Sequence, residues 1–502
     1  MKTLCLLVAS VAGVLVGGSD VGRAGSPTTI CVNAAQSHCF QSIQAAVDGA
    51  QTGDTIVLGA GVFQGGVTIT KSIRIVGVSA GATVVAGGGP VVTIGTLGGA
   101  NSGLRVELDR LTISGGANAA AGNAFGGGVA ILQGDGPAAP GATVDIDASV
   151  ITDNQAAPAA TFPSDPAPCT VPAAQCAFAL GGGIANAGVL TLTNSRVTDN
   201  LAGSPGITRT SRGAGIYNGA TGTLTVRDSV VSGNQAVVSP PNGCFTEGGG
   251  IEDFGTMTVE NSRITGNSSV VVSSVPSSIL GNDLEQNADA GGIDLSPNAS
   301  ATISNSNISD NTVSDFDSGG DAQSFNGGID GEGTLALSGS IVDRNTVSAR
   351  VPAGSGLVTA ATAGGVGLSG GSSTIRSSHI GGNRLDALSA SGVAFVGGAG
   401  IEDVSAQLAV DRTVVTANSA GAIAAALTLA LGGGILDTSL GGLDPQMTLT
   451  DSVVTANRLT ANSSTPLGGG VFNGGILGGG PYPITLTGTV IEGNSPDQCA
   501  GC

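Results

Sequence analysis

Residues 181–200, with the sequence GGGIANAGVLTLTNSRVTDN, are one copy of a pattern that recurs along most of the chain. This copy starts with three glycines and ends at an asparagine, and nine similar copies end in the same way. The ten asparagines are Asn154, Asn200, Asn234, Asn267, Asn311, Asn345, Asn383, Asn418, Asn457 and Asn494. Three residues before each of them is Ile or Val, five residues before is Ser or Thr, and eight residues before is an aliphatic residue. Fixed columns of this kind identify an array of repeats.

The spacing of the apolar columns indicates β-strands. Aliphatic residues recur at intervals of two, as Leu190 and Leu192 do before Asn200, and two is the side-chain period of a strand. About 19 residues separate the glycines from the asparagine in the shortest copies, which allows three short strands with Gly and Asn in the left-handed conformation at the bends. We therefore predict an all-β right-handed parallel β-helix of triangular coils, stacked about 4.8 Å apart, with the asparagine amides bonded from coil to coil. A helical solenoid is the main alternative, but the abundance of Thr, Val and Gly argues against it.

The ends of the predicted solenoid carry their own signals. Residues 40–51 place Ile43, Ala46 and Val47 on one helical face just before the apolar run at 55–58, which predicts an N-terminal capping helix. The repeat coils extend over about 104–494, and a cysteine-containing cap follows at 495–502. We interpret residues 25–502 as one β-helix domain.

The first residues are typical of a secretory signal. Lys2 precedes an apolar run from Leu4 to Val16, and small residues around Ala24 suit cleavage there, so that residues 1–24 are the predicted signal peptide. A membrane anchor is the alternative, but the run of about 13 residues is shorter than the roughly 20 that span a bilayer. We therefore expect a secreted or cell-surface protein without a transmembrane segment after signal removal.

The net charge narrows the possible partners, and the cysteines indicate disulfides. A formal net charge of −19 at pH 7 makes nucleic acid an improbable partner, and it would attract cations or simply keep a surface solvated. Three pairs of cysteines lie close enough in sequence to form local disulfides in an oxidising compartment. These candidates are Cys31 with Cys39, Cys169 with Cys176, and Cys499 with Cys502, which leaves Cys244 without an assigned partner. A zinc site is less favoured because His38 and His379 lack ligand-like spacing.

Two stretches carry resemblances to known proteins. SIQAAV at 42–47, GDTIVL at 53–58 and VTITKSIRIVG at 67–77 resemble the start of pectin-lyase-like β-helix proteins. Copies of GGGI followed by SxVxxN or SxIxxN resemble the repeats of chlamydial polymorphic outer membrane proteins, although Val or Ile stands here where those repeats often have Phe. The first resemblance implies a fold that includes polysaccharide lyases and glycosidases, and the second implies an exported surface protein.

Acidic residues follow the glycine corner in several copies. They are Glu252, Asp253, Asp294, Asp330, Glu332, Glu402, Asp403 and Asp437. We expect them to form one acidic stripe, with Asp253, Asp330 and Asp403 as candidate catalytic carboxylates and the stripe as a candidate Ca²⁺ site. Their spacing does not distinguish a catalytic pair from other stacked acidic residues, because stacked positions lie about 5 or 10 Å apart in any β-helix. A solvated acidic turn is the simpler interpretation.

The asparagine turns lead into variable excursions at 155–180, 235–247, 268–290 and 346–363. Such excursions could gather into a partner-binding surface, but tolerated loop insertion is the simpler interpretation. We therefore expect an adhesion or structural module whose partners are polysaccharides or cell-surface components. The alternative is a polysaccharide lyase or hydrolase, for which Ca²⁺ is the candidate cofactor, and no other cofactor is predicted.

Overall fold

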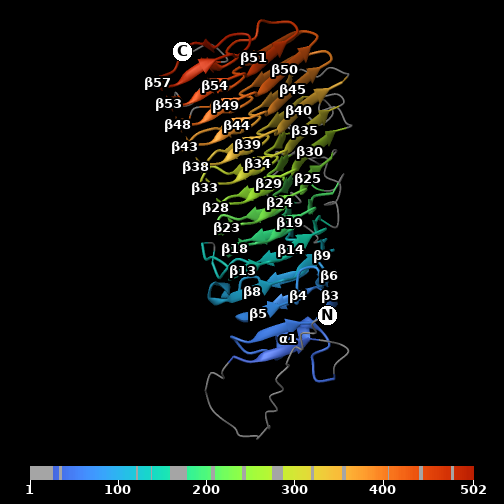
Figure 1. Ribbon diagram of the computed structural model, residues 1–502. Helices are drawn as coiled ribbons and strands as arrows, with labels where there is room; N and C mark the ends of the chain where they lie inside the picture. Colours follow the sequence, from blue (N-terminus) through green and yellow to red (C-terminus); the bar gives the residue numbers. More distant parts are fainter. Residues whose placement is uncertain are drawn as a thin grey trace, which may run out of the picture.

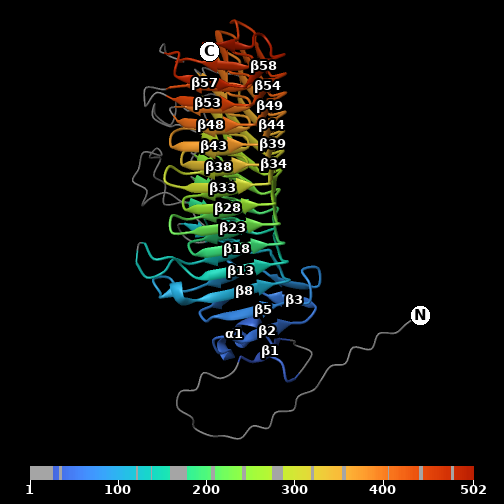
Figure 2. The same ribbon diagram turned by 60° about the vertical axis from the view of Figure 1, so that its left-hand side comes forward.

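The chain folds into an all-β parallel β-helix, and this confirms the predicted fold class (Figure 1, Figure 2). The computed structural model describes residues 27–502 except for 33–36, 120–122, 137, 159–177, 205–207, 209, 240–244, 274–286, 318–320, 353–357, 405, 440–444 and 476–479. The proposed signal peptide at 1–24 lies outside the described residues. No helix of the described part is long and apolar enough to cross a membrane.

The chain passes through five parallel sheets in a fixed order, numbered sheet 1 to sheet 5. They contain 14, 13, 10, 9 and 13 strands in that order. Their first and last strands are β1 (Thr29–Val32) and β57 (Ile484–Thr487), β3 (Gly61–Gln64) and β58 (Val490–Glu492), β10 (Ala117–Asn118) and β55 (Arg458–Ala461), β11 (Ala124–Phe125) and β51 (Leu427–Leu431), and β4 (Val67–Ile69) and β59 (Cys499–Ala500). Strands of one sheet come from successive coils, so every equivalent residue has its neighbours directly above and below.

Most coils contain five strands rather than the three predicted. A full coil consists of β18 (Val189–Thr193), β19 (Arg196–Thr198), β20 (Leu201–Ala202), β21 (Thr210–Arg212) and β22 (Ile216–Asn218). Among the described residues, coils of three strands occur at both ends of the stack, namely β5 (Ile73–Val76), β6 (Thr83–Ala86) and β7 (Val92–Ile94) near the start and β57, β58 and β59 at the finish. The triangular expectation therefore describes the two ends of the stack, because the coils between β10 and β51 extend sideways through sheets 3 and 4.

The predicted asparagine ladder is present and buried. The Nδ2 atom of Asn200 donates to Oδ1 of Asn234 at 2.9 Å and to the carbonyl of Ile151 at 3.0 Å. The backbone N–H of Asn200 donates to the same Oδ1 of Asn234 at 3.0 Å. Because each amide is satisfied by its neighbours, the ladder can lie inside the protein without unpaired polar groups.

The corner glycines adopt the predicted left-handed conformation, as Gly181 does at φ 68°, but the bend at the asparagine turn uses another residue than the one predicted. None of the ten ladder asparagines has a positive φ; the residue before them does, for example Asp199 and Asp310, both at φ 57°. A second left-handed residue precedes the Ser/Thr column, as Asn194 does at φ 50°. The ladder amide must face inward to reach the next coil, so the exposed residue before it makes the bend.

Sheets 3 and 4 build a second hydrophobic core beside the main one. The residues predicted to be variable loops begin and end as paired strands, as in β40 (Thr346–Val351) and β41 (Val358–Thr362). The buried side chains of this core include Val271, Val313, Val347, Leu385, Val396 and Leu459. The loop interpretation is therefore wrong for the ends of these excursions, whose small Ala and Val residues pack two sheets together.

Different elements cover the two ends of the stack. Helix α1 (Ile43–Gly49) lies at the N-terminal end and buries Ile43, Ala46 and Val47 against the first coils. At the other end Gln498 takes the place of the next ladder asparagine, since its Oε1 accepts from Nδ2 of Asn494 at 3.1 Å.

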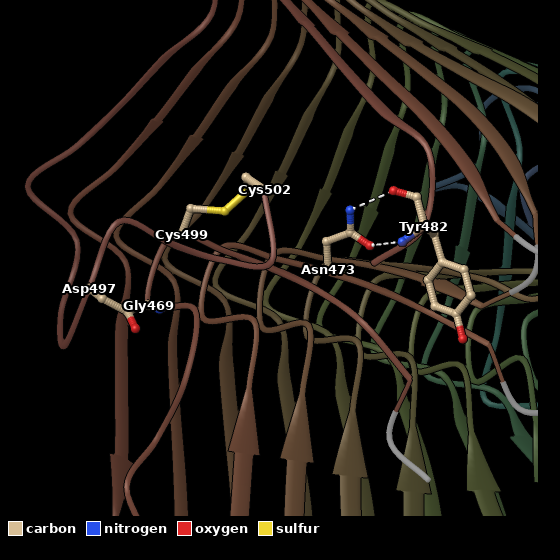
Figure 3. Close-up of a disulfide and its surroundings, with 6 residues drawn as sticks. All are labelled: Gly469, Asn473, Tyr482, Asp497, Cys499 and Cys502. Atoms are coloured by element: carbon tan, nitrogen blue, oxygen red, sulfur yellow. Dashed lines mark hydrogen bonds between the residues drawn. A yellow bond between two sulfur atoms is a disulfide. The ribbon is translucent and has the colours of Figure 1, made fainter. Parts of the chain in front are cut away.

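Two of the three candidate disulfides are present. Cys31 and Cys39 are bonded with Cα atoms 4.9 Å apart, and Cys499 and Cys502 with Cα atoms 6.0 Å apart. Figure 3 shows the second disulfide near Asn473, whose side chain holds the backbone of Tyr482 through two hydrogen bonds of 2.9 Å. Cys169, Cys176 and Cys244 lie outside the described residues.

Candidate functional site

The acidic residues after the glycine corner fall into two columns and do not form a single stripe. In β27 (Ile251–Asp253) the side chain of Asp253 shares the core-facing side with Ile251, while Glu252 points to the opposite side. The inner column comprises Asn186, Asn218, Asp253, Asp403, Asp437 and Asn473, and the outer column comprises Tyr217, Glu252, Asp294, Asp330 and Glu402. The structure therefore does not bring Asp330 together with Asp253 and Asp403.

The lower half of the inner column is a hydrogen-bonded ladder. Asn186 Nδ2 donates to Asn218 Oδ1 at 2.7 Å, and Asn218 Nδ2 donates to Asp253 Oδ1 at 2.6 Å. The same oxygen of Asp253 accepts from the backbone N–H of Gly255 at 3.0 Å. Burial nevertheless raises the pKa of Asp253 to about 6, against the lowering effect of these bonds. These hydrogen bonds give Asp253 a structural role, because they hold its side chain in the turn from sheet 5 to sheet 1.

The upper half of the inner column contains two stacked carboxyl groups. Asp403 and Asp437 are both fully buried, and neither oxygen of Asp437 has a hydrogen-bond partner. Burial, together with the charge of Asp437, raises the pKa of Asp403 to about 8, and burial raises the pKa of Asp437 to about 7. Between Asp253 and Asp403 the same column contains the uncharged residues Leu295, Gly331 and Leu368.

The outer column is buried as well, so the interpretation as a solvated acidic turn is wrong for it. Glu252 is 1% exposed, and Asp294 and Asp330 are 6% exposed. Glu402 is also buried, whereas Glu332, just after its strand, is exposed. The cover comes from sheet 4, which the sequence did not predict.

Sheet 4 contributes three charged residues that the sequence analysis did not single out. Arg212, Glu247 and Asp289 occupy equivalent positions on β21, β26 (Phe245–Glu247) and β31 (Asn287–Asp289). The glycine corner then turns the chain back into sheet 5, and Gly248 adopts φ 59° there, a conformation that other residues rarely adopt. A scan of the position just before each corner would have found this column.

Arg212 is held on two sides. Its Nε lies 2.5 Å from Oε2 of Glu247, and its guanidinium stacks 5.0 Å from the ring centre of Phe254. The ring of Tyr217 lies 5.7 Å from that of Phe254. Burial lowers the pKa of Arg212, but the charges of Glu247 and its neighbours outweigh this and raise it, so Arg212 stays cationic.

Three carboxyl groups converge next to this arginine, and we call Glu247, Glu252 and Asp294 the carboxylate triad. One oxygen from each lies within 4.8 Å of the others. Oε1 of Glu252 accepts from the Ser296 hydroxyl at 3.3 Å, and Glu252 is also within hydrogen-bonding reach of Asp294. Two carboxyl groups in such contact must share either a proton or a cation.

Burial and mutual repulsion dominate the electrostatics of the outer column. Burial and the charge of Glu247 raise the pKa of Glu252 well above its ordinary value. Burial and the charge of Glu252 do the same for Asp294, and burial raises the pKa of Asp289 to about 7. Chemically, the arrangement can bind a cation through carboxylate oxygens, or can hold and release protons near neutral pH.

Comparisons with known proteins give two distant structural likenesses. No protein-family model matches the chain, and no curated protein matches its sequence. The A-module of the Azotobacter vinelandii mannuronan C-5 epimerase AlgE4 is similar over 92% of this chain and 94% of its own, with 14% identity and a TM-score of 0.30. The AlgE6 A-module is similar over 91% of this chain and 95% of its own, with 15% identity and a TM-score of 0.24. At this identity and TM-score, neither likeness carries information about activity.

Proposed function

We propose that the protein is an exported β-helix that acts as an adhesion or structural module for polysaccharides or cell-surface components. The observation that carries this proposal is an ordered hydroxyl face on sheet 1. Two adjacent columns present Ser or Thr outward, namely Thr223, Thr256, Ser300 and Thr334 in one, and Thr191, Thr225, Thr258 and Thr302 in the other. Sheet 1 forms one continuous ladder in Figure 2.

The regularity of this face supports a repetitive partner. Successive coils repeat the same hydroxyl groups at about 4.8 Å, the spacing of neighbouring strands. A polysaccharide also presents its hydroxyl groups at a regular interval, so many weak contacts can form along one line and add up. The face needs no mobile parts, because parallel pairing to the coils above and below holds each strand.

The test is binding of the purified protein to a panel of acidic and neutral polysaccharides, with Thr225→Lys and Thr258→Lys as disrupting variants. We expect retention on at least one polysaccharide and its loss in the double variant, because two long charged side chains would break the flat face. Thr460→Lys, an exposed residue on sheet 3, is the matched control and should bind like the unmodified protein. Equal retention of the double variant and the unmodified protein would refute the assignment to this face.

A second candidate is a polysaccharide lyase or hydrolase, favoured by the grouping of Arg212, Tyr217 and Glu247. These side chains are partly exposed and combine a cation, a phenol and a carboxyl group, the group types that acid–base catalysis uses. New reducing ends or unsaturated products from the same panel, lost in Arg212→Ala, would support the enzyme. Binding without products supports the module.

A further inference from the structure

The carboxylate triad joins parts of the molecule that are separate in the chain. Glu247 ends a strand of sheet 4, Glu252 lies in the following strand of sheet 5, and Asp294 lies one coil further on β32 (Ile293–Leu295). Their oxygens converge within 4.8 Å. Whatever compensates their charge therefore connects sheet 4 with sheet 5 and one coil with the next.

The contacts within the triad leave one buried oxygen without a partner. Glu252 is 1% exposed, and its Oε2 has no hydrogen-bond partner. A buried charged oxygen without a partner is costly, and most such atoms in native structures have a partner or a bound ion or water. The unpartnered oxygen thus indicates a ligand that is not part of the chain.

The charge around the triad is strongly negative. Asp289, Asp330 and Glu332 lie near enough to act on the same groups electrostatically. Within the described part of the chain, Arg212 is the basic residue that forms an ion pair with the cluster, and it contacts Glu247. One guanidinium cannot balance the cluster once its carboxyl groups are ionised, and a divalent cation would supply the missing positive charge.

We propose that Glu247, Glu252 and Asp294 bind a Ca²⁺ ion that fastens sheet 4 to sheet 5 and links two successive coils. The donors are carboxylate oxygens with a hydroxyl nearby, and hard cations such as Ca²⁺ prefer this set, whereas zinc prefers nitrogen and sulfur donors. Ca²⁺ also accepts the irregular geometry of ligands from different strands more readily than Mg²⁺. This role is independent of which partner the module binds.

The first experiment is calorimetric titration of CaCl₂ into the full-length protein after removal of cations with a chelator. We expect saturable binding, and a higher unfolding temperature with Ca²⁺ than without it. Glu252→Gln and Asp294→Asn should each weaken Ca²⁺ binding by about tenfold or more. Glu247→Gln, at a partly exposed position that a folded protein tolerates more easily, should weaken binding in the same direction.

Asp403→Asn is the matched control, because it removes a buried carboxylate from the inner column and leaves the triad intact. It should bind Ca²⁺ like the unmodified protein. The proposal is overturned if the stripped protein shows neither binding nor a change in unfolding temperature. It is equally overturned if Glu252→Gln and Asp294→Asn both titrate like the unmodified protein.

Terbium luminescence locates the ion by a separate readout. Tb³⁺ replaces Ca²⁺ at oxygen sites and emits when a nearby tyrosine is excited, and the chain has two tyrosines and no Trp. Tyr217 is paired with Glu252 on the neighbouring strand, and burial, then the charges of Glu252 and Glu247, raise its pKa, whereas Tyr482 is at the C-terminal end of the stack. Tyr217→Phe should lose the emission while it still binds Ca²⁺, and Tyr482→Phe should keep the emission. The opposite result would place the ion elsewhere and overturn the proposal.

Discussion

Glu252 and Asp253 are neighbours in the chain but lie in different environments. Glu252 faces sheet 4 and meets Asp294 and Ser296, whereas Asp253 faces inward and completes the ladder that starts at Asn186. Strand alternation is the cause, since successive side chains point to opposite faces. For the same reason Asp403 and Asp437 stack on the core side, where nothing compensates Asp437.

At this scale we predict that Asp437→Leu stabilises the protein at alkaline but not at acidic pH. Burial raises the folded-state pKa of Asp437 from 3.8 to about 7. Below about pH 4 the carboxyl group is protonated in both states and has no effect. As the pH rises to about 7, the unfolded chain ionises while the folded chain keeps its proton, so the unfolding free energy falls by at most about 1.4 kcal/mol per pH unit.

Urea unfolding at about pH 4 and about pH 8 measures this effect. The variant should have a higher unfolding free energy than the unmodified protein only at the higher pH. An equal increase at both pH values would contradict the prediction. Leu368→Asp is the opposite change, because it introduces a carboxyl group at the equivalent position two coils earlier. It should destabilise the protein more at the higher pH.

At the level of elements, the segments that look like insertions in the sequence form the paired strands of sheets 3 and 4. Their strands are rich in Ala and Val, so the two sheets pack closely and form a core of their own. This side structure also covers the outer column and supplies Arg212 and Glu247. Without it, Glu252 and Asp294 would lie on an open sheet surface.

We predict that Leu385→Ala, in β45 (Arg384–Ser389), lowers the unfolding free energy by about 2–5 kcal/mol, the usual cost of a large buried truncation. Leu385 is fully buried in the second core. Ile423→Ala is the control, because Ile423 lies on the neighbouring strand β50 (Ser419–Ala424) and is 56% exposed. Chemical unfolding followed by circular dichroism measures both. Equal, small effects would mean that sheets 3 and 4 add no core.

The whole molecule is a stack in which each coil contacts the coils before and after it. The asparagine ladder fixes the register, as the contact between Asn311 and Asn345 shows across 34 residues. Stability in such an array is approximately the sum of coil and interface contributions. The molecule should therefore tolerate the loss of one complete coil.

We predict that deletion of residues 312–345, which removes one coil between equivalent ladder positions, leaves a folded protein about 4.8 Å shorter. Every remaining column keeps its register because the strands after Asn345 then follow Asn311 directly. Deletion of 312–328 alone would join unlike strands and should prevent folding of the neighbouring coils. Circular dichroism and small-angle scattering distinguish the outcomes, and equal behaviour of both deletions would contradict register control.

The sequence by itself determined three strands of each coil, those of sheets 1, 2 and 5. The asparagine, Ser/Thr and aliphatic columns recur at fixed spacing. A side chain that must pack against its equivalents in the coils above and below requires a similar residue in every repeat, so the pattern is visible in the sequence. The N-terminal helix and the disulfides Cys31–Cys39 and Cys499–Cys502 were predicted for a similar reason, because each depends on residues close in sequence.

The tertiary structure alone decided how the charged residues group. Arg212 and Asp294 are far apart in the chain, and they act on each other only because sheet 4 folds back over sheet 5. Sheet 4 was hidden because its strands follow connections of variable length, so their residues drift out of alignment with the asparagines. The strands of sheet 3 begin directly after the asparagines, as β20 does after Asn200, but they belong to the segments that were interpreted as loops. Burial, which raises the pKa values of Glu252 and Asp294, depends on this cover and not on the local sequence.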